Sequence, residues 1–98
     1  MRLVVAPEAQ ASINQAIDWY LSEGGKALAA RAAKAFRSAV KSIASAPLLN
    51  PPYPDVPGVR RKVMSRFPYL VFYAVDEDKV VVLEVLHAAK KPLKTFHQ

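Results

Sequence analysis

A proline-rich stretch near the middle of the chain, PLLNPPYPDVPG, divides the sequence into two parts with different patterns. It spans residues 47–58 and holds five of the eight prolines in the 98 residues. Proline lacks a backbone N–H and fixes φ, so such a stretch forms neither a helix nor a central strand. We expect a stiff, extended loop here that carries the chain from a helical part into a sheet.

The part before this loop carries two apolar stripes at helical spacing. The first stripe follows Pro7, which suits the first turn of a helix because its missing N–H costs nothing there. Gly24 and Gly25 separate the stripes and favour a glycine-capped helix end with a sharp reversal. Pro47 stops the second stripe. We therefore predict a short strand over residues 2–6, followed by an antiparallel hairpin of two helices.

The part after the loop has the pattern of three strands, over residues 59–66, 69–75 and 79–88. Phe67-Pro68 and the acidic run Asp76–Asp78 form the connections, and such short connections favour an antiparallel meander. The predicted order is β-α-α-β-β-β. We expect one α+β domain over residues 1–98, in which the helical hairpin packs on a small, mainly antiparallel sheet.

The charge of the chain is unevenly distributed. The formal net charge is +6, and the segment from Lys26 to Arg66 holds nine cations but only one acid, Asp55. A basic surface of this kind favours anionic partners, either nucleic acid or an acidic protein. The alternative interpretation is a solvated surface that keeps the protein soluble.

Several classes of site lack the residues that they need. The chain contains no cysteine, which excludes disulfide bonds, thiolate metal sites and thiol nucleophiles. Its two histidines have no metal-binding spacing, and its three glycines form no phosphate loop. We expect no metal, no cofactor and no small-molecule substrate. No apolar segment reaches transmembrane or signal-peptide length, so we expect a cytoplasmic protein without a membrane partner.

The strand predicted over residues 59–66 separates its side chains by face, because alternate residues of a strand share one face. Val59 and Val63 suit the face that packs on the helices. The residues Arg60, Lys62 and Arg66 would then gather on the open face. Such a cluster attracts phosphates or carboxylates, or else its charges protect an edge strand from aggregation.

Two further residues join these cations as candidate contacts for a partner. Tyr73 either packs in the core or stands exposed for stacking beside the cations. His87 ends the last strand, on the face that carries Val81, Leu83 and Val85, and serves either in proton transfer or in a backbone hydrogen bond. The predicted partner-binding residues are Arg60, Lys62, Arg66, Tyr73 and His87.

In combination, these segments resemble the RelE/ParE superfamily of toxins from bacterial type II toxin–antitoxin systems. The resemblance covers nearly the whole chain and is carried by PEAQASINQAIDWY, VRR, FPYLVFYAV and VVVLEVLHAAKKP. It implies one of two activities. RelE-like members cut messenger RNA on the ribosome with basic residues on the sheet and a tyrosine or histidine near the C-terminus, whereas ParE-like members inhibit DNA gyrase. Both are neutralised by a small antitoxin.

The RelE-like residue set is incomplete in this chain. Of five matching positions, two remain basic, Arg61 and Lys90. The other three carry apolar side chains: Val63, Leu70 and Phe96. The resemblance therefore implies a ParE-like toxin that arrests growth as a non-enzymatic gyrase inhibitor. The alternative is a ribosome-dependent endoribonuclease acting on mRNA through Arg61, Lys90 and His97, and a third interpretation is a relic that only binds its antitoxin.

Overall fold

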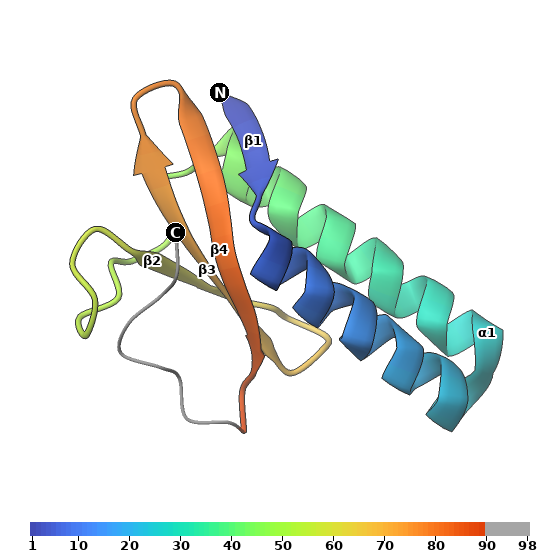
Figure 1. The fold of residues 1–98 in the computed structure, drawn as a ribbon. Coiled ribbons are helices and arrows are strands. Elements are labelled where there is room, and N and C mark those ends of the chain that lie inside the picture. The colour runs from blue at the N-terminus through green and yellow to red at the C-terminus, as the bar shows by residue number, and fades with distance from the viewer. Residues whose placement is uncertain (90–98) are drawn as a thin grey trace.

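A computed structural model describes residues 1–89 of the protein (Figure 1). Its elements are β1 (Arg2–Val5), α1 (Pro7–Ser45), β2 (Arg60–Val63), β3 (Tyr69–Asp76) and β4 (Lys79–His87). The helical layer packs on one face of a four-stranded sheet, so the predicted α+β architecture is confirmed.

The helical layer is a hairpin whose reversal lies at Gly25. This residue has φ 83° and ψ −176° inside α1, a conformation that is essentially restricted to glycine. It separates a first arm (residues 7–24) from a second arm (residues 26–45), and Figure 1 shows the arms running side by side in opposite directions. The prediction of a helical hairpin from Gly24-Gly25 is confirmed. Within residues 1–89, no helix combines the length and hydropathy needed to cross a bilayer.

The sheet has the strand order β1-β4-β3-β2. The strands β2, β3 and β4 form the expected antiparallel meander, while β1 pairs parallel to β4 over Arg2–Val5 and Lys79–Val82. A parallel pair requires a long crossover connection, and the hairpin is the first part of it. β2 is shorter than the predicted strand of residues 59–66, because the regular pairing ends at Val63.

Both faces of the sheet bury apolar side chains. On the helical face, Ile13, Tyr20, Phe36 and Ile43 of α1 pack in one core with strand residues such as Val71. A second cluster on the opposite face contains Tyr53, Val59, Leu70, Phe72 and Leu83. The proline-rich loop covers that face, and the Arg61 N–H of β2 donates to the Pro51 carbonyl of the loop at 3.2 Å. Because this second core fills the face opposite the helices, the candidate site lies on the helical side of the sheet.

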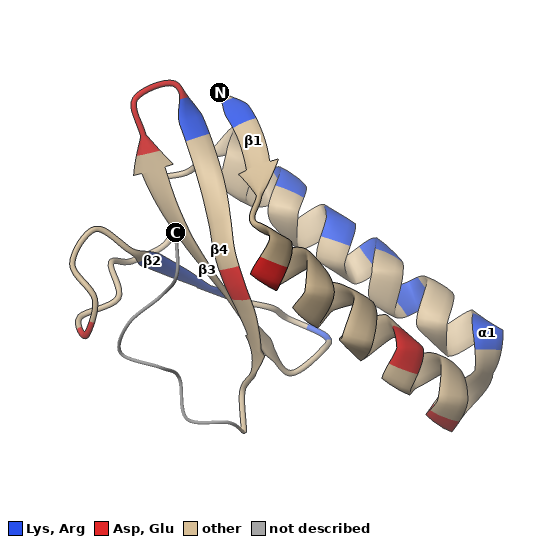
Figure 2. Ribbon diagram, in the orientation of Figure 1, with Lys and Arg blue, Asp and Glu red and all other residues tan. Residues whose placement is uncertain are grey.

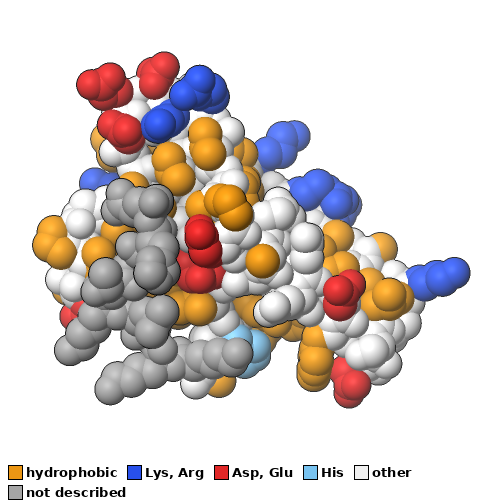
Figure 3. Space-filling view, in the orientation of Figure 1, with side chains coloured by type: hydrophobic (Ala, Val, Ile, Leu, Met, Phe, Trp, Pro, Cys, Tyr) orange, Lys and Arg blue, Asp and Glu red, His pale blue; other side chains and the backbone are white. Residues whose placement is uncertain are grey.

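The two arms of the hairpin carry opposite charge. The first arm contains Glu8, Asp18 and Glu23 and no cation, and the second contains only cations among its charged residues. These cations are Lys26, Arg31, Lys34, Arg37 and Lys41. Figures 2 and 3 show acids on the first arm and cations along the second. The first arm therefore favours positively charged partners, and the second arm favours negatively charged ones.

Candidate partner-binding groove

A groove of about 820 Å³ lies between the second arm and the segment that leads from β2 into β3. Its apolar lining comes from Leu28, Ala35 and Ala39 of the arm and from Met64 and Phe67 opposite them. We call this site the cationic groove, because four basic side chains also line it: Arg31, Lys34, Lys62 and Arg66.

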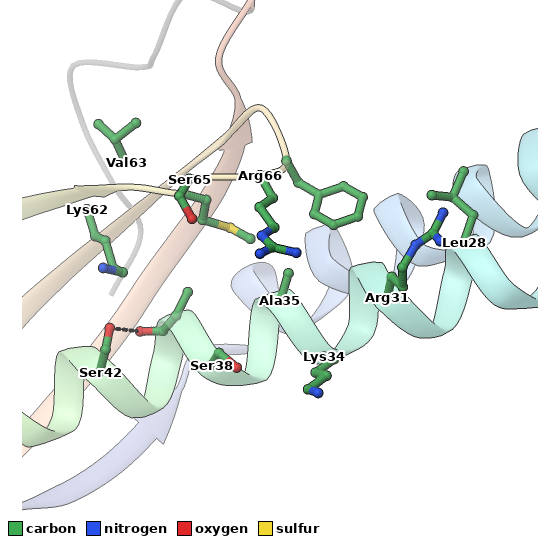
Figure 4. A pocket seen from close by; sticks show the side chains of 13 residues that line it. Leu28, Arg31, Lys34, Ala35, Ser38, Ser42, Lys62, Val63, Ser65 and Arg66 are labelled. Atoms are coloured by element: carbon green, nitrogen blue, oxygen red, sulfur yellow. Dashed lines mark hydrogen bonds between the residues drawn. The ribbon is translucent and has the colours of Figure 1, made fainter.

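The four cations of the cationic groove come from both of its walls. Figure 4 shows Lys62 and Arg66 projecting from the sheet side toward the second arm, which carries Arg31 and Lys34. No aspartate or glutamate lines the groove. Among the described residues the only ion pair joins Lys79 to Asp76, at 4.0 Å. The positive charge of the groove is therefore not neutralised within the described part of the chain.

The structure corrects the face assignment of β2. Arg60, Lys62 and Met64 do share a face, but Lys62 lies opposite Val71 and Arg60 opposite Tyr73, which both belong to the helical core. These cations therefore lie on the helical side of the sheet and not on its open side. Val59 and Val63 point the other way: Val59 packs under the proline-rich loop, and Val63 is 61% exposed.

Two predicted contact residues instead hold the turn after α1. The Tyr73 hydroxyl donates to the Pro47 carbonyl at 2.7 Å and accepts from Asn50 Nδ2 at 3.3 Å. Arg60 Nη1 donates to the Asn50 carbonyl at 2.6 Å. Tyr73 is fully buried and has no surface for a partner, so burial corrects that expectation. Arg60 is half-buried, and its hydrogen bonds give its side chain a structural role.

His87 lies apart from the cationic groove, at the end of β4. It shares the helical face with Val85, but not with Val81 and Leu83, which belong to the opposite side. The cause is a β-bulge. Tyr73 of β3 pairs with Val82 and Phe72 with Glu84, so that Leu83 is an extra residue and the alternation shifts. The alternation predicted from the sequence did not include this bulge.

Of the three residues of the nuclease alternative, the structure describes only Arg61. The Arg61 guanidinium lies over the Tyr53 ring, 5.6 Å from its centroid, on the open face of the sheet. Lys90 and His97 lie outside the described residues. Val63 is exposed and Leu70 is buried, and neither supplies a charge beside Arg61. Residues 1–89 contain no group of three histidines or acids that could hold a metal ion.

Sequence reasoning did not include the cations of the second arm in the site. Arg31 and Lys34 lie away from the apolar stripe of the second arm, and nothing in the sequence pattern places them opposite Lys62 and Arg66. The available signal was the helical spacing of Leu28, Arg31, Ala35 and Ser38, which puts cations beside small residues on one face. The small side chains leave room for the groove, and the cations line it.

The helical hairpin packed on a mixed sheet is the fold that the resemblance to the RelE/ParE superfamily implied. The family model of the ParE toxin of the type II toxin–antitoxin system parDE matches residues 3–92. The chain therefore belongs to the ParE toxin family and is a toxin of a type II toxin–antitoxin system.

A solved structure supports the same fold. The chromosomal ParDE TA system from P. aeruginosa contains a chain that superposes with a TM-score of 0.80 at 24% sequence identity. The match covers 89% of this chain and 95% of that one. The comparison with curated proteins gave no match.

Proposed function

We propose that this toxin inhibits DNA gyrase by binding to it, and that the cognate antitoxin neutralises the toxin by occupying the cationic groove. Membership of the ParE family supports the first part. The chemistry of the groove supports the second part: four cations that form no ion pair within residues 1–89 line it together with apolar side chains.

The open face of the sheet also favours gyrase binding over RNA cleavage. Nuclease relatives place several cations around the scissile phosphate, where they stabilise charge in the transition state. Here the Arg61 guanidinium stacks on Tyr53, and the β3 residues opposite Arg61 and Val63 are the buried Phe72 and Leu70. Within residues 1–89, this face supplies an apolar surface under the proline-rich loop, and Arg61 is the cation beside it. The endoribonuclease alternative predicts cleaved mRNA ends after induction, and their absence would exclude it.

The shape and charge of the cationic groove specify the antitoxin segment that fits it. The lining runs along the arm from Leu28 to Ser42, which corresponds to roughly 21 Å of helix at about 1.5 Å per residue. An extended or helical segment of this length can place apolar residues against Met64 and Phe67. Its acids would then meet Lys62 and Arg66. We expect the antitoxin to bind with a segment that combines both residue types.

The antitoxin part of the proposal is tested by removing two groove cations. The double variant Lys62→Ala/Arg66→Ala loses two contacts of at most about 1 kcal/mol each, because Lys62 is only half-buried and Arg66 is exposed. We expect the affinity for the antitoxin to decrease about 5- to 30-fold, measured by isothermal titration calorimetry.

The matched control is Arg37→Ala/Lys41→Ala, which removes the same charge from exposed positions of the second arm outside the groove. We expect this control to change the affinity less than about twofold, because long-range charge effects are screened at physiological salt. Equal losses in the two double variants would show that net charge, and not the groove, determines antitoxin binding.

A further inference from the structure

A second groove, of about 320 Å³, lies between the first arm and the end of β4. We call it the aromatic groove, because Trp19, Tyr69 and His87 line it, together with Ser12, Gln15 and Leu86. The Tyr69 and His87 rings meet edge to face at 5.2 Å. The Trp19 side chain is 57% exposed, so much of its indole surface is open to a partner.

The charge around the aromatic groove is opposite to that of the cationic groove. Among residues 1–89, no lysine or arginine lines it. Ser12 donates from Oγ to Glu84 Oε1 at 2.7 Å, which places a carboxylate one hydrogen bond away from the lining. The first arm adds Asp18, next to Trp19 in the chain, and carries no cation. A positively charged group is therefore favoured here.

Glu84 is the one charged residue inside the valine-rich part of β4. The structure gives hydrogen-bond partners to one of its two carboxylate oxygens. It lies at the β-bulge, beyond Val82, where the pairing with β1 ends. Its Oε1 accepts from the Val85 N–H at 2.8 Å and from Ser12. Within the described residues, Oε2 has no hydrogen-bond partner and the carboxylate forms no ion pair. Residues 1–89 therefore leave the negative charge of this half-buried carboxylate unbalanced, which favours a cation nearby.

We propose that the aromatic groove binds a cationic side chain, an arginine or a lysine, of a protein partner. A cation is attracted to the faces of tryptophan and tyrosine, and an arginine also stacks on them through its planar guanidinium. The Glu84 carboxylate supplies the opposite charge. The two grooves of the protein then select side chains of opposite sign. This proposal does not depend on the identity of the toxin's target.

The proposal is tested with short peptides and the fluorescence of Trp19, which is the only tryptophan in the chain. The probe is acetyl-Gly-Arg-Gly-amide. In two control peptides, citrulline or norleucine replaces the arginine, which keeps much of its size but removes its charge. We expect the arginine peptide to change the emission saturably and to bind at least threefold more tightly than either control. Equal binding of the citrulline or norleucine peptide would overturn the proposal.

A matched pair of variants then identifies the carboxylate. Glu84→Gln keeps an oxygen that accepts from Ser12 and Val85 but removes the charge, and Glu8→Gln removes one charge from an exposed position outside the groove. We expect Glu84→Gln to weaken the binding of the arginine peptide at least threefold, and Glu8→Gln to weaken it less than 1.5-fold. Equal effects of the two substitutions would contradict the assignment.

A third variant keeps the proposal testable if Glu84→Gln does not fold. Trp19→Leu changes an exposed side chain and should leave the fold intact. Binding to this variant is followed by the NMR signal of the Gln15 backbone amide. We expect the preference for arginine over citrulline to decrease to less than 1.5-fold. A preference retained in full would show that the cation binds elsewhere.

Discussion

Tyr73 and Arg60 fasten the turn after α1 to the edge of the sheet. Their hydrogen bonds end on the carbonyl groups of Pro47 and Asn50, in a stretch whose leucines, Leu48 and Leu49, are 67% and 82% exposed. This turn has little apolar packing of its own, so the two polar side chains determine its position. The partners of both side chains come from a distant loop, which alternation within a strand does not reveal.

Removing the Tyr73 hydroxyl tests this account. Tyr73→Phe leaves the ring in the core but deprives the Pro47 carbonyl of its donor. We expect the free energy of unfolding to decrease by about 1 to 2 kcal/mol, the usual cost of a part-buried polar group that loses its partner. Chemical denaturation measures the change. An unchanged midpoint and slope would show that water replaces the hydroxyl without cost.

Tyr69 makes the stability depend on pH in the alkaline range. Burial raises the pKa of its hydroxyl to about 12, and the neighbouring Tyr20 adds to the rise. Between about pH 10 and 12 the unfolded chain therefore loses this proton while the folded chain keeps it. The stabilisation is present in full below pH 10 and is lost as the pH rises to 12.

We expect the free energy of unfolding of the wild type to decrease more steeply between pH 10 and 12 than that of Tyr69→Phe, which has no proton to lose. The two curves, measured by denaturant titration at each pH, should run parallel below pH 9. Parallel curves across the whole range would contradict the raised pKa.

At the scale of elements, the hairpin of α1 depends on the backbone of Gly25. Its φ of 83° is strained for any residue with a side chain, although a Cβ there would meet nothing within 4 Å. Gly25→Ala should therefore destabilise the protein through backbone strain alone, by about 1 to 3 kcal/mol. Thermal denaturation followed by circular dichroism measures this. An unchanged melting temperature would mean that the reversal forms equally well with alanine.

The elements themselves were largely predictable, and the direction of their side chains was not. Apolar spacing and Gly24-Gly25 were enough for the hairpin, since these signals are local. The face of β2 was predicted wrongly because Val59 was assigned to the helical core, whereas the proline-rich loop provides a second core under Tyr53. The bulge at Leu83 shifted the face of His87 for a similar reason: it depends on the pairing with β3.

At the scale of the whole molecule, the hairpin and the sheet enclose two grooves with opposite electrostatic character. The cationic groove lies along the second arm, and the aromatic groove lies between the first arm and β4. Neither could be located from the sequence, because each combines residues from distant segments. The segregation of charge between the arms was visible, however, in the run of nine cations and one acid from Lys26 to Arg66.

The central claim, that this ParE family toxin inhibits DNA gyrase, is tested most directly with the purified protein. It is added to a gyrase supercoiling reaction and, in parallel, to a cell-free translation reaction. We predict that supercoiling stops, that translation continues, and that prior addition of the cognate antitoxin restores supercoiling. Unimpaired supercoiling together with arrested translation would contradict the account and favour the ribosomal activity.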